Sequence, residues 1–143
     1  MTAKRNPHQT TDQIELSALR SLKELPPLRF EWDRLTVADK RNGMFRGYAW
    51  NVLWLQHFAP QAKPHILKLS AKSGELMGLA SFCETIYRER FFQHPALGFT
   101  GREVVCGDFL DLLAAPGHEQ AVLHRVLVYL ENRLERHPLV VCG

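Results

Sequence analysis

The chain has 143 residues, a length that suits one domain. Hydrophobic residues make up 45% of it and charged residues 23%, close to globular averages, which argues against a mostly disordered or fibrous protein. The net charge of +3 comes from 18 basic and 15 acidic residues that are scattered along the chain, whereas nucleic-acid binders usually cluster their basic residues. We therefore expect a solvated surface of mixed charge and no nucleic-acid partner.

Cysteine usage and hydropathy indicate where the protein works. Cys83, Cys106 and Cys142 form no C-x-x-C pair, and an odd number of cysteines without a motif fits a reducing compartment better than a disulfide framework. The N-terminal stretch is polar, and no run approaches the roughly 20 apolar residues that a membrane span needs. We expect a cytoplasmic protein without a membrane partner, with a disordered tail over residues 1–12 and one domain over residues 13–143.

The domain begins with a predicted strand and a helical segment. Apolar and polar residues alternate over residues 14–21, which is the period of a strand. Ser21 and Glu24 have the spacing of a capping box, so a helical turn begins there until two prolines interrupt it. A helical pattern resumes at Phe30.

A second helix is predicted over residues 48–58. Trp50, Leu53, Trp54 and Phe58 recur at steps of three and four residues, as on one face of a helix. We interpret this aromatic stripe as core packing, with a ligand groove as the alternative.

The middle of the chain predicts strands. Residues 65–71 and 75–87 alternate or are apolar and are joined by a short glycine turn, so they form a hairpin. A loop follows, with one short strand at residues 97–99. The near-continuous apolar run at residues 108–115 predicts a further strand with both faces covered, which we expect to be central in the sheet.

A long amphipathic helix follows Gly117, with apolar residues four apart from Val122 to Leu134, and a last strand covers residues 139–142. The order of elements is therefore β, α, α, β, β, short β, β, α, β. We predict an α/β (α+β) domain with a mixed, mostly antiparallel sheet flanked by helices. One right-handed crossover should lead from the strand at 108–115 to the strand at 139–142.

The turn at Pro116 and Gly117 joins a strand to a helix N-terminus, the topology that holds phosphate in many proteins. A diphosphate needs several converging amides, but Pro116 has no amide hydrogen. Glu119 places a carboxylate in the first helical turn, where it interacts with the helix dipole and would repel a phosphate. We interpret the segment as a compact turn closed by its own acidic residue.

Four stretches resemble a known family. The order of elements and these stretches resemble the GNAT acyltransferase fold, and most closely the tandem GNAT-like proteins associated with bacterial cellulose biosynthesis. The resemblance covers roughly residues 14–143. It implies a GNAT-like domain that is truncated or a half domain, the N-terminal half of a longer protein. The stretches are EWDRL at 31–35, FRGYAWNVLWLQHF at 45–58, GELMGLASF at 74–82 and GDFLDLLAAPGHEQAVLHRVLVYL at 107–130.

The resemblance implies transfer of an acyl group from acetyl-CoA or another acyl-CoA to an amine, with the coenzyme in a gap between two parallel strands. The Arg/Gln-x-x-Gly-x-Gly/Ala loop of the family is absent at residues 114–121. We therefore expect no tight coenzyme binding in this segment, where Gly117 and His118 are the candidate contacts.

Three functions remain open. The first is a non-CoA-binding half, inactive alone, that supports an N-acetyltransferase-type domain in the parent protein. The alternative is a non-catalytic, GNAT-shaped interaction or scaffold module. The third is an acyltransferase that binds the coenzyme within this half.

Three carboxylates are the candidate catalytic residues. Glu84 stands at the end of the second hairpin strand, where GNAT enzymes often keep a base. Asp108 and Asp111 lie in an apolar run, where a carboxylate is costly unless it is paired. On a strand, residues three apart point to opposite faces, so these two cannot share a proton. The alternative for the aspartates is a bond to a loop amide or an arginine, and for Glu84 a solvated strand end.

The seven histidines show no metal-ligand spacing, so we expect no metal site and place histidines such as His65 and His124 at the surface. As partners, the resemblance implies a small-molecule amine or a second GNAT-like domain. The sequence also leaves a homodimer open.

Overall fold

The computed structural model describes residues 13–39, 43–101, 111–136 and 140–142. Among these residues, the helices are all too short or too polar to cross a membrane. The elements, in chain order, are β1 (Ile14–Leu19), the 3-10 helices η1 (Leu22–Glu24) and η2 (Pro26–Leu28), α2 (Arg29–Ala38), the 3-10 helix η3 (Met44–Arg46), α3 (Tyr48–His57), β2 (Lys63–Ala71), β3 (Leu76–Glu89), β4 (Phe92–Phe99), β5 (Leu113–Ala114), α4 (Glu119–Arg136) and β6 (Val140–Cys142).

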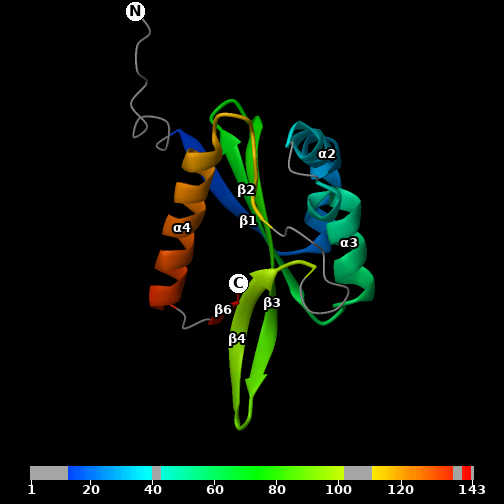
Figure 1. Ribbon diagram of the computed structural model, residues 1–143, viewed down its shortest axis with the longest axis vertical. Coiled ribbons are helices and arrows are strands. Elements are labelled where there is room, and N and C mark those ends of the chain that lie inside the picture. Colours follow the sequence, from blue (N-terminus) through cyan, green and yellow to red (C-terminus); the bar gives the residue numbers. More distant parts are fainter. Residues whose placement is uncertain (1–12, 40–42, 102–110, 137–139, 143) are drawn as a thin grey trace, which may run out of the picture.

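The sheet lies between two helical layers, with α4 on one side and α2 and α3 on the other (Figure 1). Its strands follow the order β1-β2-β3-β4-β6, and β5 pairs with β3 beside this path. The pairs from β1 to β4 are antiparallel, whereas β4 and β6 are parallel. The predicted α+β class, a mixed and mostly antiparallel sheet flanked by helices, is confirmed.

The predicted strand at residues 108–115 is shorter than expected. Residues 108–110 lie outside the described part of the chain, and of the rest only Leu113–Ala114 forms a strand. Leu113 packs in the cluster on the α2 side and Ala114 in the cluster on the α4 side, so both faces are covered as expected.

The central position expected for this strand was wrong, because among the described strands β5 pairs only with β3. The connection through α4 leads from β5 to β6 in the same sheet, as predicted. Both strands run parallel to β4, and β6 pairs with β4. Helices on both faces can bury a strand that has one neighbour, and an apolar run cannot distinguish this from a central strand.

Strand β4 is longer than the expected strand at residues 97–99. It begins at Phe92, directly after a tight turn in which Arg90 has a φ of 42°. Pro95 lies within it, opposite Ile86 of β3. Because β6 pairs with β4 only at Ala96–Gly98, Pro95 has no described neighbour on its other side, and a proline is tolerated at such an edge.

The sheet separates two apolar cores. On β2, Ile66 points into the core under α2, whereas Leu67 and Leu69 point into the core under α4, as the period of a strand requires. Helix α4 approaches β3 closely at Gly78, where an added Cβ would lie 2.6 Å from Cγ1 of Val122.

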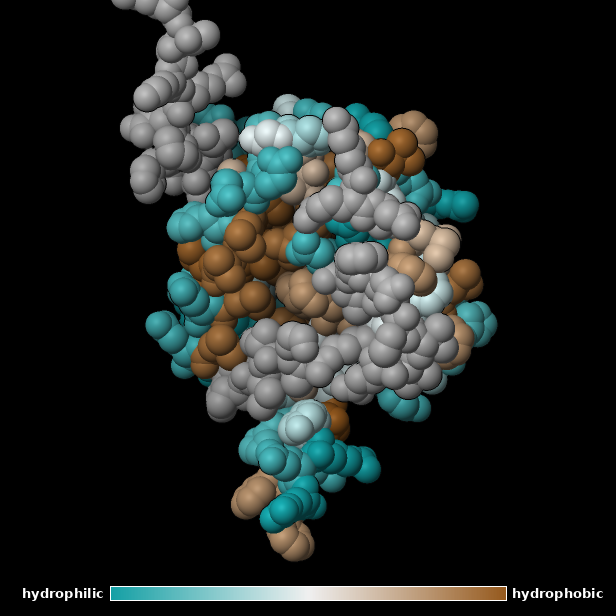
Figure 2. Space-filling model, viewed as in Figure 1, coloured by the Kyte–Doolittle hydropathy of each residue, from teal (hydrophilic) through white to brown (hydrophobic). Residues whose placement is uncertain are grey.

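The buried faces of two helices differ from the expected stripes. In α3, Leu53 and Phe58 are 51% and 45% exposed, while Asn51, Trp54 and Leu55 are buried. This helix is apolar on most sides, so its pattern does not fix which face is buried. In α4 the buried positions are Val122 and Val126, and exposed leucines contribute to the apolar band that Figure 2 shows over this helix. These exposed leucines are Leu123, Leu127 and Leu134.

Candidate functional site

A polar cluster lies between the sheet and α4, and two strands supply its centre. His65 follows the alternation of Leu67 and Leu69 on β2, so it faces α4. On β3, Glu84 lies two residues beyond Phe82, which is the cross-strand partner of His65. The carboxylate is therefore the diagonal neighbour of the imidazole on the same face, within reach of direct contact.

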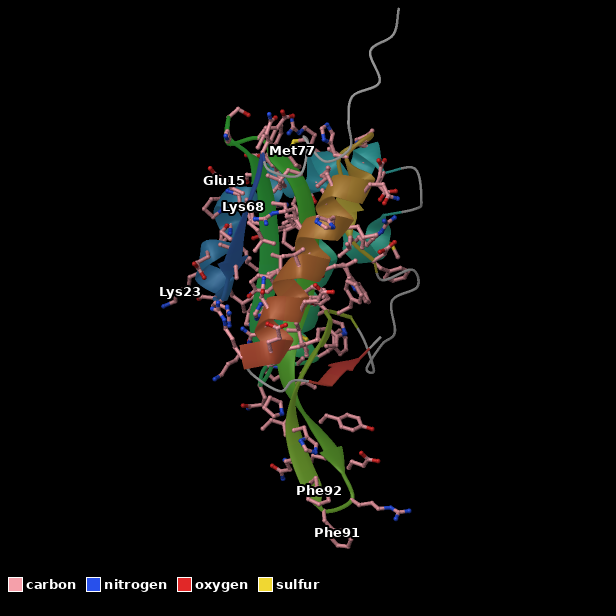
Figure 3. The ribbon with its side chains drawn as sticks, turned by 90° about the vertical axis from the view of Figure 1, so that its left-hand side faces the viewer. Glu15, Lys23, Lys68, Met77, Phe91 and Phe92 are labelled. Atoms are coloured by element: carbon pink, nitrogen blue, oxygen red, sulfur yellow. The ribbon has the colours of Figure 1, made fainter. Side chains whose placement is uncertain are left out.

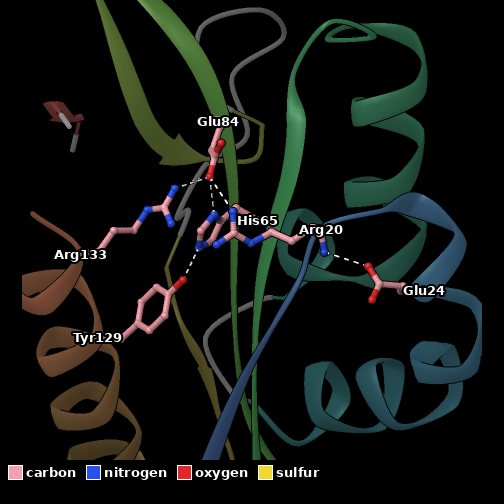
Figure 4. A network of polar contacts seen from close by, with 6 residues as sticks. All are labelled: Arg20, Glu24, His65, Glu84, Tyr129 and Arg133. Carbon is pink, nitrogen blue, oxygen red and sulfur yellow. Dashed lines mark hydrogen bonds and ion pairs between the residues drawn. The ribbon is translucent and has the colours of Figure 1, made fainter. Parts of the chain in front are cut away.

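The contacts of this cluster converge on a single carboxylate oxygen (Figure 4). Oε1 of Glu84 lies 2.8 Å from Nδ1 of His65 and 3.0 Å from Nη1 of Arg20, and it also accepts from Nη2 of Arg133. On the other side of the imidazole, Nε2 lies 2.8 Å from the hydroxyl oxygen of Tyr129. The cluster thus joins β1, β2, β3 and α4.

Burial and charge fix the protonation states. Burial lowers the pKa of the His65 imidazole, and the guanidinium groups of Arg20 and Arg133 lower it further, against the opposing hydrogen bond to Glu84. Burial alone would raise the pKa of the Glu84 carboxyl. The hydrogen bond from His65 and the charges of Arg133 and Arg20 outweigh this effect, so that pKa lies below its ordinary value.

The neutral imidazole can take only one tautomer that satisfies both neighbours. A carboxylate accepts and never donates, so Nδ1–H donates to Glu84, and the Nε2 lone pair accepts from the Tyr129 hydroxyl. This is an ordered chain from carboxylate to imidazole to phenol, and the ring of His65 is fully buried.

Such a chain holds elements together more readily than it moves a proton. A general base works best when its pKa lies near the working pH, whereas the pKa of Glu84 is lowered and three donors occupy one of its oxygens. His65 is fully buried with both nitrogens occupied, and three donors already occupy Oε1 of Glu84. Glu84 is therefore not a solvated strand end, and its contacts are those of a clamp between the sheet and α4.

The other two candidate carboxylates are Asp108 and Asp111. Asp108 lies outside the described residues. Asp111 accepts a hydrogen bond from the Leu112 amide at 2.7 Å, the loop-amide contact that was the alternative to a catalytic role. It lines a hollow of about 10 Å³ together with Ser81 and Thr100, a space that suits one water molecule rather than a substrate.

The turn before α4 has little left to offer an anion. The Gly117 amide donates to Oε1 of Glu119 at 3.1 Å, and the His118 amide donates to the carbonyl of Ala115 at 2.9 Å. Gly117 has a φ of 82°, which favours glycine. Since Pro116 has no amide hydrogen, none of positions 116–118 has a free backbone amide, and the carboxylate of Glu119 already accepts from this turn.

His65 is buried, so the prediction that it lies at the surface was wrong. The signal was available, because His65 is in step with Leu67 and Leu69 on the buried side of the alternating strand. On α4, Tyr129 and Arg133 continue the spacing of the buried Val122 and Val126 at steps of three and four residues. What the sequence could not supply is that these two faces meet at Glu84.

Within the ranges that the structure describes, no group of three or more histidine, cysteine or acidic side chains could hold a metal ion. Comparisons of the chain with protein-family models, with curated proteins and with solved structures gave no match.

Proposed function

We propose that this chain is the supporting, non-CoA-binding half of a GNAT-like, acyl-CoA-dependent N-acyltransferase that works in the cytoplasm. In this proposal it does not bind the acyl-CoA tightly or perform the transfer, and its partner is a second GNAT-like domain that does. The amine acceptor and the acyl-CoA are the substrates of the parent protein as a whole.

The order of elements supports the acyltransferase part of the proposal. A first strand, two helices and three antiparallel strands are followed by β5, which leads into the long helix α4, and by a last strand that pairs in parallel with β4. A strand that leads through a long helix to a last strand is the order that the resemblance implies for residues 108–142.

The hydrogen bond from the Gly117 amide to the Glu119 carboxylate is the observation that most supports a half domain without tight coenzyme binding. A diphosphate bound at this turn needs several converging amides, and the Gly117 amide already donates to a carboxylate. It would also lie beside that negative charge, in the first turn of a helix whose dipole the charge already stabilises. Displacing Glu119 would cost both interactions, so the turn favours its own side chain over a ligand.

The polar cluster supports the same conclusion. Glu84 is the candidate base that the resemblance implied, yet its lowered pKa and its three donors suit an anion that holds α4 on the sheet. In the proposal, this clamp gives the half domain a rigid surface for the catalytic half.

Isothermal titration with coenzyme A and acetyl-CoA tests the proposal, together with a thiol-release assay over a panel of amines. We expect no heat of binding at micromolar coenzyme and no release of thiol. Glu119→Gln is the companion variant, because it keeps the size of the side chain and removes its charge. Micromolar binding by the unmodified chain that depends on Gly117 would refute the supporting role and favour an acyltransferase complete within this chain.

A second candidate function is a non-catalytic interaction module, and the exposed aromatic residues at the end of the β3–β4 hairpin favour it. Phe91 is 93% exposed and Phe92 is 67% exposed, which is unusual for phenylalanine on a surface without a partner. The rate of acyl transfer by a catalytic half, measured with and without this chain, would separate the candidates. A supporting half should change that rate, whereas a plain scaffold would bind partners without changing it.

A further inference from the structure

The β3–β4 hairpin projects from the body of the protein as a two-stranded arm. Residues 85–89 of β3 and residues 92–95 of β4 are all exposed, while the strands become buried again at Ala96 and Leu97. Figure 3 shows Phe91 and Phe92 at the far end of the arm, pointing away from the body. A two-stranded ribbon without a covered face is marginally stable in water, so an arm of this kind gains from a partner.

Along the arm, the β3 edge that faces away from β4 pairs with none of the described strands. Strand β2 pairs with β3 only as far as Glu84, opposite Lys63. Beyond that point β4 is the one described strand that pairs with β3, on its other side. Residues 85–89 therefore present a five-residue backbone edge that is free to pair with another strand.

A groove runs beside this open edge at the base of the arm. It has a volume of about 580 Å³ and lies between the loop at residues 58–63 and the β3 residues Glu84, Thr85, Ile86 and Arg88. Its walls include the rings of Phe58 and Pro60, so it has apolar surface to offer an incoming side chain.

We propose that this edge and groove bind the arm of a second copy of the chain, which forms a symmetric dimer. Tyr87 is the middle residue of the open edge, and a twofold axis there pairs the two edges antiparallel over all five residues. Ile86 then lies opposite Arg88 of the second copy, and Thr85 lies opposite Glu89. This gives a continuous four-stranded ribbon, in which the β3 edges of the two copies cover each other.

The same arrangement matches the ends of the arms to the grooves. In an antiparallel pair, the tip of one arm lies at the base of the other. Phe91 of the second copy therefore reaches the groove beside Phe58, and the most exposed apolar residue of the arm loses its contact with water.

Neighbouring registers are less favourable. Moving the twofold axis one residue toward the body places strand residues 88 and 89 of the second copy opposite Glu84 and Cys83. Strand β2 already pairs with β3 at these two positions. Sliding it one step outward places Arg88 directly opposite Arg88 of the second copy, and like charges in this position repel. A second copy also needs no further ligand, because the edge complements itself.

Sedimentation velocity at about 1–100 μM, the range in which a small interface dissociates, tests the dimer and its register. We expect a concentration-dependent dimer at low ionic strength. Thr85→Lys places a lysine opposite each Glu89 and should tighten the dissociation constant by about 2- to 30-fold. Thr85→Glu places like charges there and should weaken it by a similar factor.

A second pair of variants separates the interface from general effects on the surface. Tyr87→Lys places two lysines at the twofold axis and should leave a monomer, whereas Val37→Lys makes the same kind of change at an 86% exposed site on α2 and should leave the dimer intact. A chain that stays monomeric even with Thr85→Lys would overturn the proposal. So would a dimer that is indifferent to both Thr85 variants and to Tyr87→Lys. Circular dichroism checks that each variant is folded.

Discussion

Nδ1 of the buried His65 on β2 lies 2.8 Å from Oε1 of Glu84 on β3, and this contact orients the imidazole toward α4. Its Nε2 then meets the Tyr129 hydroxyl, also at 2.8 Å. The ring is therefore a bridge between the sheet and a helix that comes much later in the chain. Its stability contribution depends on all of its polar atoms being satisfied, since a buried polar atom without a partner is costly.

Replacing Tyr129 with phenylalanine keeps the ring and removes the donor to His65. Nε2 of the buried imidazole is then left without this partner, so we expect the free energy of unfolding to fall by about 1–3 kcal/mol. Urea denaturation followed by circular dichroism measures this. Tyr87→Phe is the matched control, since that hydroxyl has no hydrogen bond to described residues and its loss should change stability by less than about 0.5 kcal/mol. Equal effects of the two variants would contradict the role of the bridge.

Stability should decrease as the pH falls, because the folded state lowers the pKa of His65 below its ordinary 6.5. Below that pH the unfolded chain binds a proton that the folded chain resists, so the contribution is complete above pH 6.5 and is lost as the pH falls toward the folded pKa. Glu84 adds a loss of the same sign at lower pH, since its pKa lies below its ordinary 4.5. Urea unfolding at several pH values between about 7.5 and 5 measures the slope of the free energy of unfolding against pH.

His65→Gln should flatten that slope, whereas His94→Gln, on the exposed part of β4, should leave it unchanged. An unchanged slope in His65→Gln would mean that another group sets the acid sensitivity.

Glu84→Gln tests the other end of the chain of contacts. It removes the charge that Arg133, Arg20 and His65 share, and we expect a loss of about 1–3 kcal/mol in the free energy of unfolding. Glu75→Gln is the matched control, because Oε1 of Glu75 lies 3.7 Å from Nη2 of Arg34 and both side chains are more than half exposed. An exposed pair of this kind contributes little, so the control should change stability by less than about 0.5 kcal/mol. Similar losses in both variants would argue against the clamp.

Gly78→Ala should destabilise the contact between α4 and β3 by about 1–3 kcal/mol, because the new methyl group would lie 2.6 Å from Cγ1 and 2.8 Å from Cγ2 of Val122. Adding Val122→Ala should recover part of the loss, since it removes both of these atoms. Thermal or urea unfolding of the two single variants and the double variant gives the coupling energy. Strictly additive effects would show that contact with the Val122 side chain is not what makes alanine unfavourable at position 78.

The sequence predicted most elements because their periods are local properties. The alternation in β1 and β2, the capping box at Ser21 and Glu24, and the long helix after Gly117 all depend on residues close together in the chain. The polar turn between β3 and β4 was placed in a longer loop, because Pro95 weakens a strand pattern although an edge strand tolerates it.

The site could be predicted only in its parts. Glu84 was a candidate, while its neighbour His65 was assigned to the surface. Each lies on the buried side of its own element, which the pattern could show. That they meet depends on the register of β2 against β3 and on the position of α4, and these are set by contacts between distant segments.

The proposed function depends most directly on the turn at residues 115–119, which we expect not to bind a coenzyme diphosphate. Amide NMR spectra recorded while coenzyme A is added test this at the atoms concerned. We expect the Gly117 and His118 resonances to keep their positions up to millimolar coenzyme. Saturable shifts of both amides at micromolar coenzyme A that disappear when pantetheine, which lacks the diphosphate, replaces the coenzyme would contradict this expectation.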